Sequence, residues 1–440
     1  MEGTVLSSRG SAMAEPKIVV EHREHLWYLL TEATQLEHMI MCQYLYAAFS
    51  LKRDPAEGLT AEQAAATERW RQVLLGIAIE EMLHLALVCN LMSAIGAAPT
   101  FTRPNFPQRS AYFPPSVQLD LLPFGAAALT HFLYLERPEG MERMDAAGFV
   151  PAAPSHAPVE PGEVMPRTQD FLTVGHLYRA IEQGVRDLAG RLGERALFVG
   201  PPRAQATPEM FRWPELIAVT DLASAQQAID TIIEQGEGAR GDWQAAHYGR
   251  FLGIWDEYSQ LAMADPTFQP ARPVLTAFTQ QPFDLTVEQP VISDPATRQV
   301  ARLFALGYEA LLQVLTRFFT HTDETDDQLG LLTGAAFSLM SGVLAPLGDA
   351  LTQLPAGPDH PGRTVGPAFE MFYLMGNFVP WQDAAWAVLS ERVAVLASQC
   401  ASAAGRDGTL AAVGAAAECA AGIQAQLTTQ VPATLHPRAR

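Results

Sequence analysis

The sequence has little basic charge and few cysteines, and both shortages narrow the functions it can have. Lysine and arginine together number 29 against 48 aspartates and glutamates, which gives a formal charge of -19. Nucleic acids and anionic membrane surfaces are bound through basic faces, so we expect neither as a partner. The four cysteines show no Cys-x-x-Cys spacing and are too few for a disulfide scaffold, which favours a reducing, cytoplasmic location.

From the distribution of apolar residues we expect neither a targeting segment nor a membrane-spanning helix. Residues 1–18 lack the apolar stretch of a signal peptide and predict a disordered leader. The longest uncharged run, residues 331–348, contains Ser, Thr, Gly and Pro, which favours a buried helix over a membrane span. There is no internal repeat, no alternating strand pattern and no Gly-rich phosphate loop. The composition, 48% hydrophobic and 18% charged, is that of a globular protein.

Apolar residues recur at helical spacing along most of the chain, which predicts an all-α fold. We expect helices at about residues 19–52, 60–95, 126–135, 171–192, 224–235, 247–263, 295–320, 328–354 and 384–428. Prolines make residues 97–168 an irregular insertion around the short helix 126–135, either a lid over a pocket or a surface decoration. The predicted organisation is a four-helix bundle over 19–264, a Pro-rich linker over 265–290 and a helical lobe over 291–430.

Acidic and imidazole groups fall within the apolar stripes of the first two predicted helices. Glu37 follows Ala33 by four residues and precedes Ile40 by three, so it points inward. Glu81 and His84 lie one turn apart on the apolar face of the second helix. An inward carboxylate is costly unless it is paired or bound to metal. A Glu-x-x-His pair together with a Glu from another helix is the arrangement that bundle proteins use for di-iron or di-manganese centres.

Two later helices complete the predicted pattern. Glu182 lies in the apolar stripe of the third helix. On the fourth, Glu237 follows Ile233 by four and is the preferred ligand, with Glu234 as the alternate. His247 is the imidazole partner, although nine residues separate it from Glu237 where the ideal pattern has two. The second metal position is therefore less firmly predicted than the first.

A plainer interpretation applies to each of these acids. Any one of them could be a core carboxylate neutralised by an arginine on the same helices, namely Arg23, Arg69, Arg179 or Arg186. A set of inward glutamates with two histidines, in the order that a bundle site requires, favours the metal.

Three blocks of sequence carry a family resemblance. They are LTEATQLEHMIMCQYLYAAFSLK, LLGIAIEEMLHLALVCNLMSAIGA and the IIEQGEG…HYGRF segment. They resemble the ferritin-like proteins grouped with iminophenyl-pyruvate dimer synthase, a group that includes VioB-like and chromopyrrolate synthase-related proteins. The resemblance implies a ferritin-like bundle and an oxidative enzyme of secondary metabolism that couples imines derived from amino acids. It also implies that Glu37, Glu81, His84, Glu182, the glutamate of the GEG segment and His247 bind the metal.

The favoured function is a non-haem di-iron oxidase or oxygenase that uses dioxygen on a small amino-acid-derived substrate. Two irons per chain are expected, with manganese or a mixed centre as alternatives. Some relatives contain haem; this sequence has no Cys-x-x-Cys-His attachment motif, yet haem is not excluded. The competing functions are a ferroxidase or iron-handling protein, and a metal-free scaffold or imine-binding partner. A homo-oligomer or a separate partner oxidase is compatible with these hypotheses.

Overall fold

The structure is a computed structural model. It describes residues 15–435 except 109–112, 115–116, 150–155, 157–158, 161, 239–241, 373–379 and 405–410. Most of the predicted leader, residues 1–14, lies outside the described residues. Residues 15–18 have neither helix nor strand, and Val19 exchanges two hydrogen bonds with Gln169.

Helices make up nearly all of the regular structure in these ranges, which confirms the predicted all-α class. They are α1 (Arg23–Ser50), α2 (Ala61–Ala94), α3 (Ala126–Leu135), α4 (Val174–Leu192), α5 (Glu194–Leu197), α6 (Pro208–Phe211), α7 (Leu222–Gly236), α8 (His247–Ala264), α9 (Pro295–Phe319), α10 (Asp326–Ser338), α11 (Ala345–Leu351), α12 (Gln382–Ala404) and α13 (Ala411–Thr428). The strands β1 (Val274–Leu275) and β2 (Thr364–Val365) form one short parallel pair.

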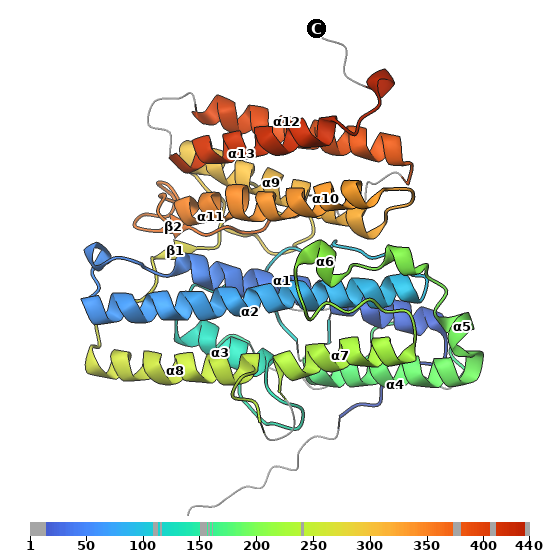
Figure 1. Ribbon diagram of the computed structural model, residues 1–440. Helices are drawn as coiled ribbons and strands as arrows, with labels where there is room; N and C mark the ends of the chain where they lie inside the picture. Colours follow the sequence, from blue (N-terminus) through green and yellow to red (C-terminus); the bar gives the residue numbers. More distant parts are fainter. Residues whose placement is uncertain are drawn as a thin grey trace, which may run out of the picture.

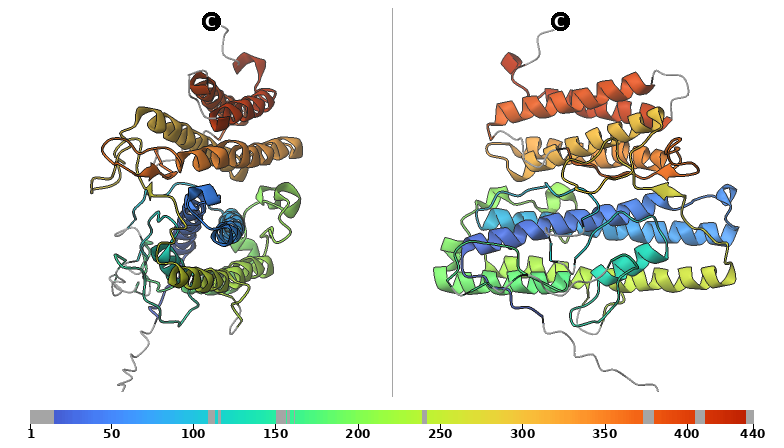
Figure 2. Two further views of the ribbon diagram at one scale, coloured as in Figure 1. Left: turned by 90° about the vertical axis from the view of Figure 1, so that its left-hand side faces the viewer. Right: turned by 180° about the vertical axis from the view of Figure 1, so that it is seen from behind.

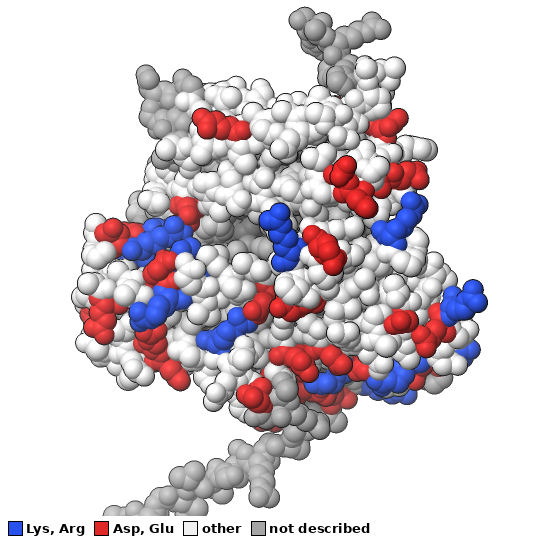
Figure 3. Space-filling model, in the orientation of Figure 1, with Lys and Arg blue, Asp and Glu red and all other residues white. Residues whose placement is uncertain are grey.

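The helices lie in stacked layers with their axes roughly parallel (Figures 1 and 2). The lowest layer contains α3, α4, α7 and α8, and the next contains α1 and α2, which pack on each other. Above them lie α9, α10 and α11, and α12 and α13 form the outermost layer. Because α1 and α2 are covered from both sides, most of their residues are buried all round rather than along one stripe. On the face in Figure 3, basic and acidic side chains are interspersed over the lower layers and sparse over the outermost one.

The lower half is a four-helix bundle in which two of the four helices are each divided in two. α3 packs beside α8 and α4 beside α7, and α7 and α8 lie end to end beneath α2 (Figure 1). α3 is followed by Pro138 and by Gly140, whose φ of +78° suits glycine. α7 is followed by Glu237 and then by Gly238 at φ +87°, whose N–H bonds to the carbonyl of Ile233. Both breaks fall near the middle of the bundle.

The predicted helix boundaries agree with most of the observed ones. The short helix 126–135 is α3 itself, so part of the predicted irregular insertion belongs to the bundle. Two predicted helices differ from the observed ones because each is divided. Residues 384–428 form two helices that pack against each other instead of one long helix, and the residues between them lie outside the described ranges. Residues 328–354 divide into α10, a π-helical segment (Leu339–Leu344) and α11.

Two helical stretches of the described chain, Ala61–Ala94 and Asp326–Leu351, are long and apolar enough to cross a membrane by length and composition alone. The first is α2, which lies inside the bundle with Glu81 and His84 buried, so its place in the core accounts for its apolarity. The second contains the uncharged run that the sequence predicts to be a buried helix, and it packs between α9 and α13.

Candidate metal centre

Five ionisable side chains meet in the middle of the bundle, beneath the α1–α2 pair. Glu37 comes from α1, and Glu81 and His84 come from α2. Glu136 is the residue that follows α3, and His247 is the first residue of α8. All five are buried, with at most 6% of any one exposed. The two breaks in the lower helices therefore place a helix end and a helix start beside the unbroken pair.

The first group is formed by Glu37, Glu81 and His84, whose nearest ligand atoms all lie within 4.8 Å of one another. The His84 Nδ1 lies 2.9 Å from Glu81 Oε2 and 3.7 Å from Glu37 Oε2. The i, i+3 spacing on α2 puts the carboxylate and the imidazole on one face, as the sequence predicts.

The second group is formed by Glu81, Glu136 and His247 and meets the same 4.8 Å limit. The His247 Nδ1 lies 3.0 Å from Glu81 Oε1 and 3.6 Å from Glu136 Oε2. The two imidazole rings are nearly parallel, at 27°, with centroids 5.4 Å apart. Glu81 thus directs one carboxylate oxygen toward each histidine and is shared by both groups.

Neighbouring polar groups fix the orientation of each of these side chains. The hydroxyl of Tyr178 donates to Glu37, and the hydroxyl of Tyr44 donates to Glu136. The far nitrogen of His84, Nε2, lies 2.9 Å from Gln235 Oε1, and that of His247 lies 2.8 Å from Glu80 Oε2. Each Nε2 faces an acceptor and can carry the ring proton. The Nδ1 atom of each ring, which faces the carboxylates, is then left as the ligand atom. Outer partners of this kind set the tautomer of histidines that bind metals.

The electrostatics of the cluster are those of acids and imidazoles sharing protons in a buried space. Burial, followed by repulsion from Glu81, raises the pKa of Glu37 to about 8. Burial alone would lower the pKa of His84, but the charges of Glu81 and Glu37 raise it to about 10. Although burial favours the neutral form of Glu81, the positive charges of His247 and His84 hold its pKa well below the usual range. Protons on the imidazoles therefore balance the carboxylate charge.

These distances suit cations in place of those protons. An ion that holds its ligands at about 2.1 Å keeps neighbouring donor atoms about 3 Å apart and opposite ones about 4 Å apart. The contacts between donor atoms within each group, from 2.9 to 3.7 Å, fall inside that range. The His247 Nδ1 is buried and makes no hydrogen bond of good geometry with any described residue, although it faces two carboxylates. Hard carboxylate oxygens with imidazole nitrogens suit iron or manganese.

The structure brings Glu37, Glu81, His84 and His247 together and leaves three other predicted residues outside. Glu182 is half-buried, pairs with Arg186 and accepts a hydrogen bond from Gln226 Nε2 at 3.1 Å. It lies at the edge of the buried face of α4, about 80° around the helix from the centre of that face. Glu234 is exposed. Glu182 is thus an acid neutralised by an arginine of its own helix, as the plainer interpretation of the sequence proposes.

Glu237 is buried but points to a different place. It caps the end of α7, 2.8 Å from Arg179 Nη2, and accepts a hydrogen bond from the backbone N–H of Glu139 at 2.7 Å. Its carboxylate occupies the space above Gly175, where a Cβ would lie 2.3 Å from Glu237 Oε1. This acid is held by an arginine and a backbone amide, and His247 instead shares its group with Glu136.

Glu136 is the residue that the sequence reasoning missed. It follows Phe132 by four residues and Leu129 by seven, the same inward spacing that identifies Glu37. That signal lies at the end of a ten-residue helix, directly before Arg137 and Pro138, in a stretch otherwise rich in proline. A short helix in an apparent insertion gave no reason to expect a bundle position.

Comparison with known proteins agrees with this architecture. The sequence model of the Ferritin-like family matches residues 30–256, more than half of the chain, and the chain belongs to this family. The matched range spans all five residues of the cluster.

Two curated relatives add detail at the level of sequence. The chain is 27% identical over 415 residues to the dichlorochromopyrrolate synthase of Lentzea aerocolonigenes, covering 86% of this chain and 39% of that protein. It is 29% identical over 375 residues to the 2-imino-3-(indol-3-yl)propanoate dimerase of Chromobacterium violaceum, covering 79% of this chain and 34% of that protein. The resemblance predicted from the sequence is thereby confirmed. The chain spans only a third to two fifths of the length of these relatives.

Among solved structures, a ferritin-like protein from Caulobacter vibrioides is similar to 73% of this chain and 97% of its own. The TM-score is 0.45 and the sequence identity 20%.

Proposed function

We propose that the chain is an oxidative enzyme with a carboxylate-bridged di-metal centre, acting on a small amino-acid-derived substrate. The observation that carries the proposal is the pair of ligand groups that share Glu81, each with its own second carboxylate and its own imidazole. The names of the two relatives, a synthase and a dimerase of an indolyl imino acid, support the choice of substrate.

The proposed ligands are Glu37 and His84 at the first position, Glu136 and His247 at the second, and Glu81 between them. This set replaces Glu182, Glu234 and Glu237 of the sequence-based set with Glu136. Iron is the favoured metal and manganese the alternative, because both accept mixed carboxylate and imidazole ligands. When bound, such a centre supplies redox chemistry with dioxygen.

The surrounding residues would hold the ligands and keep water away. Tyr178 donates a hydrogen bond to one carboxylate oxygen of Glu37, and Tyr44 donates one to Glu136. In each glutamate the other oxygen is left to face the centre. Gln235 and Glu80 hold the two imidazoles through Nε2. Arg250 pairs with Glu80 and neutralises it, so this outer acid does not compete for the ion.

For the substrate, we propose oxidative joining of two imino-acid molecules. Forming one carbon–carbon bond between two C–H positions releases two electrons and two protons, which dioxygen takes up. This assignment concerns the part of the reaction that the present chain would perform, since the named relatives are more than twice its length.

The test compares Glu81→Ala with Glu182→Ala, because both glutamates were candidates on sequence grounds and only the first lies in the cluster. Each variant is purified from iron-supplemented cells, and its iron and manganese per chain are measured together with dioxygen uptake in the presence of an indolyl imino acid. Loss of metal and of substrate-dependent uptake is expected for Glu81→Ala, with Glu182→Ala unchanged. Full metal content in a folded Glu81→Ala variant would refute the proposed centre. Dioxygen uptake that needs iron but no organic substrate would instead support iron handling.

A further inference from the structure

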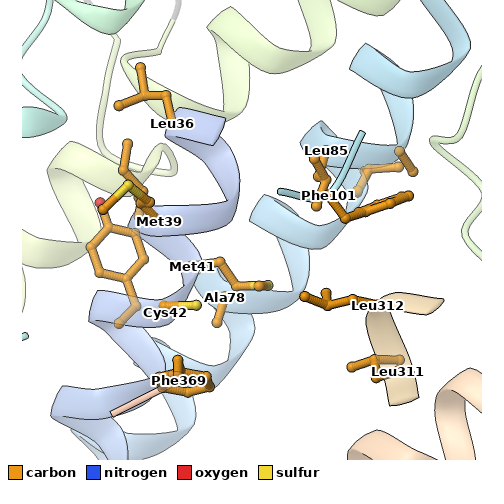
Figure 4. Close-up of a cluster of buried hydrophobic side chains, with 14 of the residues drawn as sticks. Leu36, Met39, Met41, Cys42, Ala78, Leu85, Phe101, Leu311, Leu312 and Phe369 are labelled. Carbon is orange, nitrogen blue, oxygen red and sulfur yellow. The ribbon is translucent and has the colours of Figure 1, made fainter. Parts of the chain in front are cut away.

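A second site lies on the opposite side of the α1–α2 pair from the metal centre. It is a cavity of about 200 Å³ between this pair and the C-terminal lobe, open to solvent at one end. Figure 3 shows the recess on that face, beside a group of acidic and basic side chains. Figure 4 shows Met41 and Leu85 on the bundle side of this region and Leu311 and Leu312 of α9 on the lobe side.

Aromatic rings make up much of the wall, which is otherwise aliphatic. They include Phe101, Phe211, Trp213, Phe304, Phe319 and Phe369. An apolar cavity of about 150 Å³ stays dry and binds a single benzene ring, so one of this size suits a ring or a fused pair of rings. The rings come from both layers, so a ligand here would touch the bundle and the lobe together.

The charged groups of the cavity favour an anion over a cation. Among the described residues, three charged side chains line it, Arg53, Arg71 and Asp349, and Arg53 pairs with Asp349. Arg71 uses Nε and Nη2 to bind Glu68, and its Nη1 makes no hydrogen bond to a described residue. Arg53 is thus neutralised by Asp349 within the cavity, whereas Arg71 is neutralised by Glu68, which lies outside the lining residues, and keeps Nη1 as a donor for an incoming acceptor.

The inner end carries a further positive charge. Arg103 is 1% exposed and lies behind Tyr308 and Phe369, donating to the Tyr308 hydroxyl at 2.9 Å and to the Phe369 carbonyl at 2.7 Å. It forms no ion pair with an acid of the described residues, an unusual state for a buried cation. Beside it, the imidazole of His38 contacts the Tyr308 hydroxyl.

We propose that this cavity binds a small aromatic carboxylate, with the ring between the two layers and the carboxylate at the mouth beside Arg71. The apolar wall would hold the ring, and Arg71 would select the acid over uncharged analogues. The inference stands on the cavity alone and uses no metal.

The experiment measures binding of indole-3-propionate and of its uncharged amide by calorimetry. The acid should bind at least about tenfold more tightly than the amide, which is the lower end of the range for one hydrogen bond to a charged group. Arg71→Gln should remove that preference. Arg69→Gln should leave it unchanged, because Arg69 lies on the same helix and pairs with Glu257 outside the cavity.

A second pair of variants tests the position of the ring. Leu75→Trp places an indole in the cavity and should abolish binding, whereas Val73→Trp adds the same group to α2 outside the lining residues and should not. No binding by the wild-type protein, equal affinity for acid and amide, or equal binding by the two tryptophan variants would overturn the inference. Metal content is measured on the same samples. A protein that loads metal but binds no acid refutes the cavity site alone, and the reverse result refutes the metal centre alone.

Discussion

The sharpest test of the proposed ligand set is the replacement of Glu136 by glutamine. This residue is absent from the sequence-based set and is the second carboxylate of the His247 group. Glutamine keeps the shape of the side chain and an amide oxygen that can accept the hydrogen bond from Tyr44, so the fold should be retained. What is lost is one negative charge and one metal ligand.

The expected magnitude follows from what remains at the second position. Without Glu136, an ion there keeps one imidazole and an oxygen of the shared Glu81. Loss of an outer partner alone weakens metal binding by about 10- to 100-fold, so loss of a ligand should cost at least about 100-fold. The metal-dependent stabilisation of the fold should fall by about 2.7 kcal/mol, because stabilisation follows the logarithm of ligand concentration over Kd.

Glu237→Gln is the matched control for Glu136→Gln. Both glutamates are 6% exposed and each follows the last residue of a helix, but Glu237 is held by Arg179. Metal per chain is measured by elemental analysis, and unfolding by denaturant is followed with and without added metal. Glu136→Gln should retain about one ion per chain and Glu237→Gln about two. The opposite result, or two ions with undiminished metal-dependent stability in Glu136→Gln, would refute the assignment.

Two further predictions concern residues around the centre and away from it. Gln235→Leu should weaken metal binding about 10- to 100-fold, because the His84 Nε2 loses its partner. Gln226→Leu, on the same helix, should have no effect. Equal metal affinity in the two variants would count against the role of Gln235. Burial raises the pKa of Glu32 from 4.5 to about 8. The unfolded chain therefore ionises at a lower pH than the folded one, and this acid costs stability as pH rises from 5 to 8. Glu32→Gln should gain about 3 kcal/mol of unfolding free energy relative to wild type between those pH values, and a difference that does not change with pH would contradict this reasoning.

The sequence predicted the fold and the α1–α2 half of the site because both rest on long, unbroken helices. Over many turns the inward direction is set repeatedly, and Glu37, Glu81 and His84 each lie between apolar residues three or four positions away. The same rule applied to α4 overstated the width of its buried face, so Glu182 was assigned inward although it lies at the edge beside Arg186.

The other half of the site could not be predicted well because it is built from helix ends. Periodicity says where a side chain points only while the helix continues, and Glu237 comes after the last turn of α7. Its direction is set by Arg179 and by the glycine at 175, which are contacts between helices and leave no local signal. Glu136 gave a local signal, but only the packing of α3 beside α8 shows that it belongs to the bundle.

The division of the lower helices also affects the charge of the proposed centre. In an unbroken helix, the residue three before His247 would supply a fourth carboxylate. That residue is Gln244, which is exposed and precedes α8. The proposed set therefore has three carboxylates for two divalent ions, which leaves one positive charge, and Glu80 does not cancel it because Glu80 pairs with Arg250. In a buried space that charge attracts anions strongly, so a substrate bearing a carboxylate would be favoured over its neutral analogue at the centre itself.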